Sequence, residues 1–335
     1  MKIIIPMAGY GKRLRPHTLS IPKPLIPLAG KPIVERLIST LAEMSGEPIS
    51  EIAFVVGRFG EKVETSLKKA AADIGARASL YYQDEPLGTA HALLCAAESL
   101  DGPLVVAFAD TLFVTDFRID KAADGLIWVK KVEDWKSFGV VKLGKDGAID
   151  EFVEKPDKFV SDLAIVGIYY FRDGEKLLDE LRYLIDNDIR DKGEYQLTSA
   201  LANLRDKGLR FYPARVDQWL DCGNKDATVD TNRHILEFIK DKAGLISPSH
   251  RNEDSLIVEP CYIGEKVALI HSIVGPYVSL GEHTLVENSV IRNSIIQSGS
   301  TVKNKVIANS MIGNYVKLNG TPLNLSLGDY VEIVE

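Results

Sequence analysis

Glycines and positively charged residues gather near the start of the chain in a pattern that suits phosphate binding. An apolar run at residues 3–5 predicts a short buried strand, and Ala8, Gly9 and Gly11 follow it. Glycine lets the backbone bend sharply and approach a ligand closely, so that its N–H groups can point at phosphate oxygens. The cations that come next are Lys12, Arg13, Arg15 and Lys23. Together these residues predict a binding site for an anionic ligand that carries phosphate.

Lys23 stands between Pro22 and Pro24, which distinguishes this segment from an ordinary turn. Prolines on both sides restrict the backbone, so the loop can direct one cation toward a ligand. Spacing excludes two common phosphate motifs. No Gly-Lys-Ser/Thr opens a helix here, and the third glycine of the dinucleotide-binding motif is absent. For the two glycines alone, a simple connection between a strand and a helix remains the alternative interpretation.

The elements before residue 110 alternate in a way that would bring these residues to one edge of a sheet. Apolar runs predict strands at 51–56, 79–83 and 103–109, and helical periodicity predicts helices at 31–44, 59–76 and 89–100. Such alternation predicts a parallel sheet covered by helices on both faces, and ligands bind these sheets at the carboxyl ends of the strands. The glycine loop, residues 83–88 and Asp110 all fall at predicted strand ends.

Residues beyond Asp110 predict a mixed extension of the sheet, which would form the second half of a cleft. Strands are expected at 125–132, 139–143, 149–154 and 163–171, separated by turn residues such as those at 145–147. Helices at 174–186 and 195–207, strands at 209–213 and 218–221, and a helix at 225–242 complete the predicted domain.

From about residue 254 the helical period disappears and short repeats take its place. Asn-Ser followed by two apolar residues occurs at 288–291, 293–296 and 309–312. Repeats of this length stack their aliphatic side chains into a ladder, which predicts a parallel β-helix. A β-sandwich of alternating strands is the alternative. The aliphatic positions recur every five or six residues, at Val274, Leu280, Val286, Ile291, Ile296, Val302, Ile307 and Ile312.

Composition is that of an ordinary globular protein, and the length of 335 residues predicts two domains, which we expect at 1–242 and 254–335. The net charge of -7 argues against a general nucleic-acid surface. No apolar run approaches the roughly 20 residues of a membrane helix, and the N-terminus lacks the pattern of a signal peptide. The scattered cysteines, Cys95, Cys222 and Cys261, argue against a disulfide framework or a zinc site. We therefore expect a cytoplasmic protein with no nucleic-acid or membrane partner.

The first loop resembles the signature of the sugar-1-phosphate nucleotidylyltransferases, Ala-Gly-x-Gly-Thr-Arg-Leu-x-Pro followed by Pro-Lys-x-Leu-x-Pro, with Lys12 in place of the usual threonine. Seven motifs of this family occur in order within residues 1–236, which makes the resemblance specific. The tail at 325–329, Leu-Ser-Leu-Gly-Asp, looks like that of the long-form glucose-1-phosphate thymidylyltransferases. Besides the loop, the matching segments are Gln83 with 86–92, 109–113, 138–141, 153–156, 167–169, 193–198 and 219–223.

The resemblance implies a fold and a reaction. The fold would be a Rossmann-like α/β nucleotidyltransferase domain with a mixed, mostly parallel sheet, followed by a left-handed parallel β-helix. The reaction would be in-line attack of a sugar-1-phosphate oxygen on the α-phosphorus of a nucleoside triphosphate, which releases pyrophosphate. The favoured substrates would be dTTP or UTP and glucose-1-phosphate. A guanylyltransferase acting on mannose-1-phosphate and a non-catalytic sugar-nucleotide-binding regulator are the alternatives, and an acyltransferase activity of the β-helix is a third.

The resemblance also implies residue roles. Asp110 and Asp221 would hold Mg²⁺, a hard cation that suits carboxylates and phosphate oxygens. Arg13, Lys23 and Lys155 would be the catalytic cations. The nucleotide would contact Ala8, Gly9, Gly11, Arg13, Gln83, Gly88, Thr89 and Asp110. The sugar phosphate would contact Gly139, Glu154, Lys155, Ile165 and Tyr169. The partners would be a nucleoside triphosphate, a sugar-1-phosphate and further copies of the chain in a homo-oligomer.

Several of these residues also have plainer interpretations. Asp110 could cap the next segment, and Asp221 could be a turn residue before Gly223. Glu154 and Lys155 could form a surface ion pair of little energetic value. His91 is expected to be a packed or capping residue rather than a catalytic base.

Overall fold

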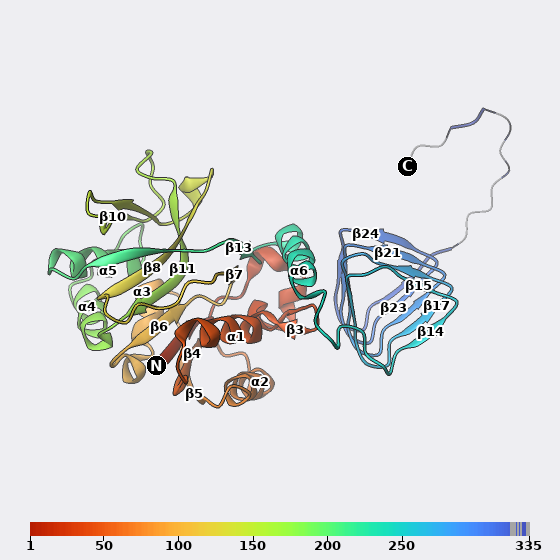
Figure 1. The fold of residues 1–335 in the computed structure, drawn as a ribbon, viewed down its shortest axis with the longest axis horizontal. Coiled ribbons are helices and arrows are strands. Elements are labelled where there is room, and N and C mark those ends of the chain that lie inside the picture. Colours follow the sequence, from red (N-terminus) through yellow and green to blue (C-terminus); the bar gives the residue numbers. More distant parts are fainter. Residues whose placement is uncertain (322–325, 327, 329, 333–335) are drawn as a thin grey trace. The chain divides into compact units, whose positions relative to one another are not determined.

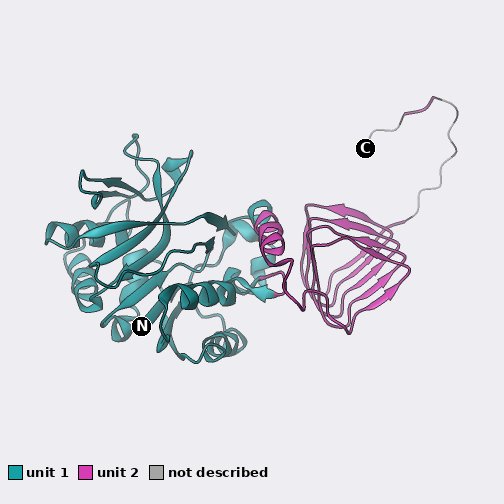
Figure 2. Ribbon diagram, in the orientation of Figure 1, with its two compact units in different colours: residues 1–26, 31–227 teal, residues 27–30, 228–335 magenta. Residues whose placement is uncertain are grey.

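The computed structural model describes residues 1–321, 326, 328 and 330–332. Leu325, Leu327 and Asp329 of the tail motif lie outside the described residues. The chain divides into two compact units, formed by residues 1–26 with 31–227 and by residues 27–30 with 228–335 (Figure 2). The domain boundaries at 242 and 254 stay a prediction.

A mixed sheet of nine strands forms the centre of the first unit (Figure 1). Its path runs β10-β9-β11-β6-β1-β4-β5, and β8 pairs with β11 and with β12. Strands β6, β1, β4 and β5 pair in parallel, whereas β11 is antiparallel to β6, β8 and β9. The bounds are β1 Lys2–Pro6, β4 Glu51–Val56, β5 Arg77–Tyr82, β6 Leu104–Ala107, β8 Gly125–Lys131, β9 Val140–Leu143, β10 Ile149–Val153, β11 Leu163–Phe171 and β12 Phe211–Arg215. The Rossmann-like mixed sheet predicted from the sequence is confirmed.

The apolar runs explain which strands lie at the centre of the sheet. Ile3 is fully buried in β1 and has Ile52 of β4 and Val105 of β6 as register partners. Strands that are buried on both faces need continuous apolar sequence rather than alternation. The helices bury apolar stripes spaced three and four residues apart, such as Leu37, Ile38 and Leu41 of α1. The helices of this unit are α1 Ile33–Ser45, α2 Glu61–Ala72, α3 Thr89–Leu94, α4 Gly174–Asp186 and α5 Leu197–Asp206.

Two features of this unit differ from the sequence-based expectation. The helix expected at 89–100 ends at Leu94, and a 3₁₀ turn at Ala97–Ser99 follows, where the Ser99 hydroxyl donates to Glu51. Residues 111–114, expected only as a motif, form strand β7 Thr111–Val114.

Strand β7 matters for the site because it pairs with β13 Gln218–Asp221 in an antiparallel ladder. The register places Asp221 opposite Thr111, the residue that follows Asp110. Two carboxylates that are far apart in the chain are therefore brought to the same end of this ladder.

The second unit contains most of helix α6 Lys225–Ile239 and a parallel β-helix with three sheets (Figure 1). Among the described residues, the strands of each sheet pair in parallel with their neighbours, so the β-sandwich alternative is wrong. The left-handed parallel β-helix expected for this part of the chain is confirmed. Val286 pairs with Leu269 and with Val302, which sets a coil of 17 or 16 residues. The strands are β14 Arg251–Glu253, β15 Leu256–Ile257, β16 Cys261–Ile263, β17 Ala268–Ile270, β18 Ile273–Val274, β19 Val278–Leu280, β20 Leu285–Glu287, β21 Val290–Arg292, β22 Ile295–Ile296, β23 Thr301–Lys303, β24 Val306–Ala308, β25 Met311–Ile312 and β26 Lys317–Asn319.

The repeated asparagines lie at corners of the coil, with positive φ angles of 47° at Asn288, 39° at Asn293 and 50° at Asn309. Asparagine adopts this left-handed conformation more readily than other residues with a side chain. The aliphatic residues between the corners form the core predicted from their spacing. Asn232 of α6 accepts hydrogen bonds from the backbone N–H of Ala29 at 2.9 Å and from the Ser279 hydroxyl at 2.8 Å.

Among the described residues, no helix is both long enough and apolar enough to cross a membrane.

Candidate active site

The loop after β1 is held in a tight conformation by its glycine and by Lys23. Gly11 has a φ of 56°, and a Cβ added there would lie 2.9 Å from the Cβ of Lys23. The Thr18 hydroxyl donates to the carbonyl oxygen of Gly11 at 2.9 Å. Because this contact leaves no space for a side chain, only glycine fits position 11 without a shift. A Cβ at Gly9 would meet only open space within 4 Å, so the backbone there is accessible to a ligand.

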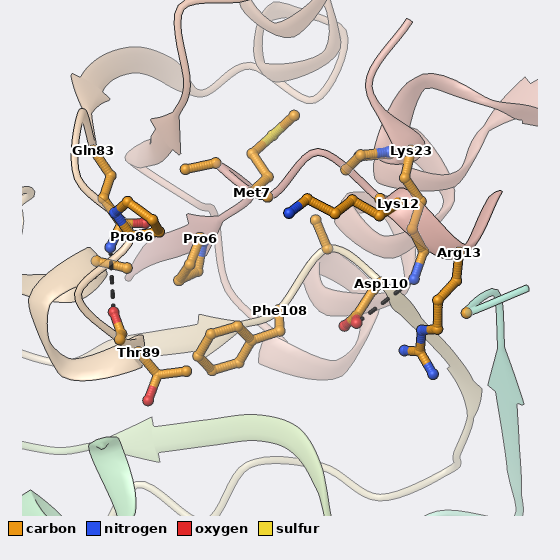
Figure 3. A pocket seen from close by; sticks show the side chains of 18 of the residues that line it. Pro6, Met7, Lys12, Arg13, Lys23, Gln83, Pro86, Thr89, Phe108 and Asp110 are labelled. Carbon is orange, nitrogen blue, oxygen red and sulfur yellow. Dashed lines mark hydrogen bonds and ion pairs between the residues drawn. The ribbon is translucent and has the colours of Figure 1, made fainter. Parts of the chain in front are cut away.

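The loop forms one wall of a cavity of about 440 Å³ in the first unit. Gln83 and Pro86 lie at one end of this cavity, whereas Lys12, Arg13 and Lys23 lie at the other (Figure 3). We call this cavity the first chamber. It contains every residue predicted to bind the nucleotide, namely Ala8, Gly9, Gly11, Arg13, Gln83, Gly88, Thr89 and Asp110.

Lys23 and Asp110 form an ion pair at the cationic end of the first chamber, with 3.5 Å between Nζ and Oδ2 (Figure 3). The lysine side chain is only 8% exposed, whereas that of Asp110 is 54% exposed. A buried ammonium needs a compensating charge, and Asp110 supplies one. The proline-flanked lysine therefore lies inside the site, beside a predicted metal ligand.

The opposite end of the first chamber is built around Gly88. Its φ is 121°, and a Cβ there would lie 2.4 Å from the carbonyl oxygen of Tyr195. The Tyr195 carbonyl accepts from the N–H of Ala90 at 2.9 Å, which ties the start of α3 to the segment before α5. The Gln83 side-chain nitrogen Nε2 donates to the carbonyl oxygen of Gly88 at 3.2 Å and lies 3.2 Å from Nδ1 of His91.

A second chamber of about 310 Å³ adjoins the first. Arg13, Thr89, Phe108 and Asp110 line both chambers, so the two share one wall. Four of the five residues predicted to bind the sugar phosphate line the second chamber, together with Asp221; these four are Gly139, Glu154, Ile165 and Tyr169.

Glu154 is a third carboxylate in the wall of the second chamber, besides Asp110 and Asp221. Burial raises its pKa above the usual range, while the charge of Lys155 and a hydrogen bond from Thr198 act in the opposite direction. The Thr198 hydroxyl donates to Oε2 at 3.4 Å. A Cβ at Gly139 would lie 3.0 Å from the same oxygen, so glycine keeps the space beside the carboxylate open. Burial likewise raises the pKa of Tyr169, whose ring meets Phe108 edge-on at 6.2 Å.

Asp221 and Arg13 approach one another around Gly223. A Cβ at Gly223 would lie 2.9 Å from Oδ2 of Asp221 and 3.3 Å from Nη2 of Arg13. The backbone N–H of Gly223 donates to Oδ1 of Asp221 at 2.9 Å. Arg13 and Asp110 line both chambers, and Asp221 of the second chamber contacts Gly223 of the first, so two carboxylates and a guanidinium lie near the junction. Such a group suits the binding of phosphate together with a hard cation.

Comparison with known proteins assigns this chain to a family. Residues 2–237 match the family model described as nucleotidyl transferase. The chain belongs to the nucleotidyl transferase family. The resemblance to sugar-1-phosphate nucleotidylyltransferases is thereby confirmed at the level of the family.

Individual relatives agree with this assignment. The bifunctional protein GlmU of Methanococcus maripaludis strain S2 is 31% identical over 263 residues, which are 77% of this chain and 60% of that protein. The chain therefore spans about 60% of the length of that relative. The glucose-1-phosphate thymidylyltransferase of Streptomyces antibioticus is 28% identical over 305 residues, which are 84% of this chain and 83% of that protein. A crystal structure of UDP-glucose pyrophosphorylase complexed with UDP-glucose has the same fold, with a TM-score of 0.59, 24% identity, and coverage of 71% of this chain and 98% of that chain.

Among the predicted site residues of this nucleotidyl transferase, Lys155 is the one that lines neither chamber. It has a positive φ of 40°, and its Nζ lies 3.9 Å from Oε1 of Glu154. Its side chain is 56% exposed, and Lys192 donates to its backbone carbonyl. The ion pair with Glu154 fits the plainer interpretation of these two residues. A role in holding phosphate would require Lys155 to turn from Glu154 toward the second chamber.

Several wall residues of the nucleotidyl transferase cleft were not predicted individually. Phe108 lies between the chambers, and Trp219 packs on Phe138 with 4.9 Å between ring centroids. The Thr89 hydroxyl donates to Oε1 of Gln196 at 3.2 Å, and Nε2 of Gln196 donates to Oε2 of Glu194 at 3.1 Å. The motif at 193–198 is the sequence signal for Glu194 and Gln196, and it does not indicate a role for either side chain.

Proposed function

We propose that the chain transfers a nucleotidyl group from a nucleoside triphosphate to a sugar-1-phosphate, which forms a nucleotide sugar and releases pyrophosphate. The observation that carries the proposal is the pair of chambers that share Arg13 and Asp110. One chamber has cations at one end, and the other has a carboxylate and aromatic side chains. We favour dTTP or UTP and glucose-1-phosphate as substrates, which is supported by the relative named glucose-1-phosphate thymidylyltransferase.

The triphosphate would occupy the first chamber with its base near Gln83 and its phosphates near Lys12, Arg13 and Lys23. The sugar-1-phosphate would enter the second chamber, so that its phosphate meets the α-phosphorus where the chambers join. Its oxygen would attack that phosphorus in line with the bond to the departing pyrophosphate. The protein need not form a covalent bond to the substrate in such a transfer, because positioning and charge neutralisation supply most of the acceleration.

Asp110 and Asp221 would hold a divalent cation, for which we propose Mg²⁺. The donor set fits, because both carboxylates line the second chamber and provide hard oxygen ligands. Among the described residues, no group of three or more histidine, cysteine, aspartate or glutamate side chains could hold a metal ion. Phosphate oxygens and water would therefore complete the coordination. When bound, the cation would neutralise charge on the reacting phosphates.

The remaining charged residues would act on different substrates. Arg13 and Lys23 would neutralise the triphosphate and the leaving pyrophosphate, and the pair with Asp110 would hold Lys23 in place. Glu154 would accept hydrogen bonds from sugar hydroxyls, in the space kept open by Gly139. Lys155 would contact the phosphate of the incoming sugar.

We also propose that the protein is a cytoplasmic homo-oligomer assembled through its β-helix. The exposed apolar side chains of the sheet formed by β15, β18, β21 and β24 support this assembly, since Ile273 is 38% and Val306 is 83% exposed. Apolar patches on a protein surface commonly mark contacts between proteins.

A matrix of nucleoside triphosphates and sugar-1-phosphates would test the activity. Purified protein with Mg²⁺ should release pyrophosphate, and the nucleotide sugar should be detected by mass spectrometry. The Asp110→Asn variant under the same conditions is the control for contaminating activity. If no combination releases pyrophosphate above that control, the proposed function is wrong.

A further inference from the structure

The backbone of Lys23 is fixed, so only its side chain can respond to a ligand in the first chamber. The lysine begins the 3₁₀ turn Lys23–Leu25 and lies between two prolines. Its carbonyl oxygen accepts from the N–H of Ile26 at 3.0 Å, and its Cβ lies 2.9 Å from where a Cβ at Gly11 would be. Because the side chain is only 8% exposed, its ammonium group is confined to the interior of the site.

The partner of this ammonium group is a carboxylate for which we have proposed another cation. Nζ of Lys23 lies 3.5 Å from Oδ2 of Asp110, and the two groups face one another (Figure 3). The Asp110 side chain is 54% exposed, so a cation from solution can reach it. Lys23 and a divalent cation would therefore compete to neutralise the same carboxylate.

Two electrostatic penalties oppose a divalent cation that binds Asp110 in the absence of phosphate. On either carboxylate oxygen the cation would lie close to the ammonium of Lys23, and like charges repel strongly where water is limited. It would also take the partner of a buried ammonium, and a buried charge without a partner is costly. Phosphate oxygens would remove both penalties, because they accept hydrogen bonds from an ammonium and are ligands for a hard cation.

We propose that Lys23 is the internal counter-ion of Asp110 and lowers the affinity of this carboxylate for a free divalent cation until a triphosphate draws the ammonium away. The cation and the triphosphate should then bind cooperatively, because each compensates a charge that the other leaves unpaired. This role is separate from neutralising the leaving pyrophosphate. The inference rests on the proposed metal site and does not depend on turnover.

Binding of Mn²⁺ to the full-length protein without nucleotide tests the inference. The EPR signal of free Mn²⁺ decreases on binding, so a titration gives the affinity directly. Lys23→Met removes the charge and keeps an unbranched apolar side chain, and it should bind Mn²⁺ about tenfold more tightly than the unmodified protein. Adding Asp110→Asn to Lys23→Met should abolish this gain, because the carboxylate that the lysine had neutralised is then absent.

Lys12→Met is the matched control for the general charge of the chamber. Lys12 lines the same chamber, but no ion pair joins it to Asp110 in the described part of the chain. Its removal should raise the Mn²⁺ affinity at most about threefold, since the interaction with the carboxylate is longer and screened. An equal gain in Lys12→Met and Lys23→Met would contradict a specific role of the ion pair.

Thermal melting gives a second readout that involves no metal. Asp110→Asn should lower the melting temperature, because it leaves the buried ammonium of Lys23 without its partner. The double variant with Lys23→Met should recover most of this loss. A double variant no more stable than Asp110→Asn alone would mean that Lys23 does not depend on Asp110 for its charge.

Equal Mn²⁺ affinities of the unmodified protein and Lys23→Met would overturn the inference, and so would a tenfold gain that persists after Asp110→Asn is added. Neither result bears on whether pyrophosphate is released. Conversely, the expected Mn²⁺ affinities without any turnover would contradict the proposed function and leave the role of Lys23 as counter-ion intact.

Discussion

The two chambers of the cleft differ in how they can recognise a ligand. The first has cationic side chains such as Lys12 and Arg13 at one end and the Gln83 amide, hydrogen-bonded to Gly88, at the other. The second is lined by aromatic side chains and by a partly buried carboxylate, Glu154, to which Thr198 donates a hydrogen bond. Charge is suited to holding several phosphates, whereas shape and directed hydrogen bonds are suited to a neutral, hydroxyl-rich sugar.

This difference distinguishes residues expected to act in the chemical step from residues expected to recognise one substrate. Arg13 and Asp110, which both chambers share, lie where the reacting phosphates would meet. Residues that line one chamber alone and lie away from this junction and the proposed metal site should affect one substrate alone. Substitutions can therefore test the comparison by asking whether their effects fall on both substrates or on one.

The largest effect is expected from Asp110→Asn and Asp221→Asn. Each should lower kcat by roughly a hundredfold or more, because each removes a carboxylate from the proposed metal site. Steady-state pyrophosphate release at saturating Mg²⁺ is the measurement, and Asp179→Asn on the exposed face of α4 is the matched control. Near-normal rates in either variant would contradict the metal assignment.

Lys23→Ala should lower kcat by about ten- to a hundredfold, since a charge-assisted contact to phosphate contributes about 1.5–3 kcal/mol. The effect should fall on the chemical step, because the charge that Lys23 meets grows as pyrophosphate leaves. Single-turnover kinetics would isolate that step. A change confined to the KM of the triphosphate would instead indicate equal binding of substrate and transition state.

Lys155→Ala should raise the KM for the sugar phosphate about tenfold with little change in triphosphate binding, again because one phosphate contact is lost. Calorimetric titration with the triphosphate provides the second readout. No change in either quantity would mean that Lys155 only pairs with Glu154 at the surface. Loss of triphosphate binding alone would mean that the chambers are assigned the wrong way round.

A smaller, pH-dependent effect is expected from Glu154. Burial raises its pKa, so protonation begins at a higher pH than for an exposed glutamate. As the pH falls through that pKa, the carboxylate becomes a neutral and weaker acceptor, and the KM for the sugar phosphate should rise. Glu154→Gln should raise this KM about two- to tenfold and remove its pH dependence. Persistence of the same pH profile in the variant would assign it to another group.

The smallest effect on the cleft is expected from removing the chain after residue 242. Both chambers are lined only by residues 6–223, so the shortened protein should keep some activity. It loses Ser279, which donates to Asn232 of α6, and some loss of stability should follow. Light scattering should show a smaller assembly. Equal numbers of copies in the full and shortened proteins would contradict assembly through the β-helix.

Much of the fold could be predicted because strands, helices and repeats depend on patterns within short stretches of sequence. Strand β11 Leu163–Phe171 and helix α4 Gly174–Asp186 have the predicted bounds, since continuous apolar sequence and helical periodicity are properties of a short window. The β-helix followed from the spacing of aliphatic residues and asparagines for the same reason. The glycine loop could also be predicted, because Gly11 and the nearby cations lie within a few residues of one another in the sequence.

The tertiary structure decided what depends on contacts between distant segments. The pairing of β7 with β13 places Asp221 opposite Thr111, the neighbour of Asp110 in the chain, and no periodicity in residues 111–114 predicted that strand. The pair between Lys23 and Asp110 joins residues 87 positions apart, so the sequence predicted two separate charges rather than one ion pair. The Gln83 amide, at the end of a strand, contacts Gly88 and His91 at the start of a helix, and the sequence predicted neither contact. The sequence determined which charged and polar groups are present. The folded structure determined which of these groups contact one another and which remain available to a ligand.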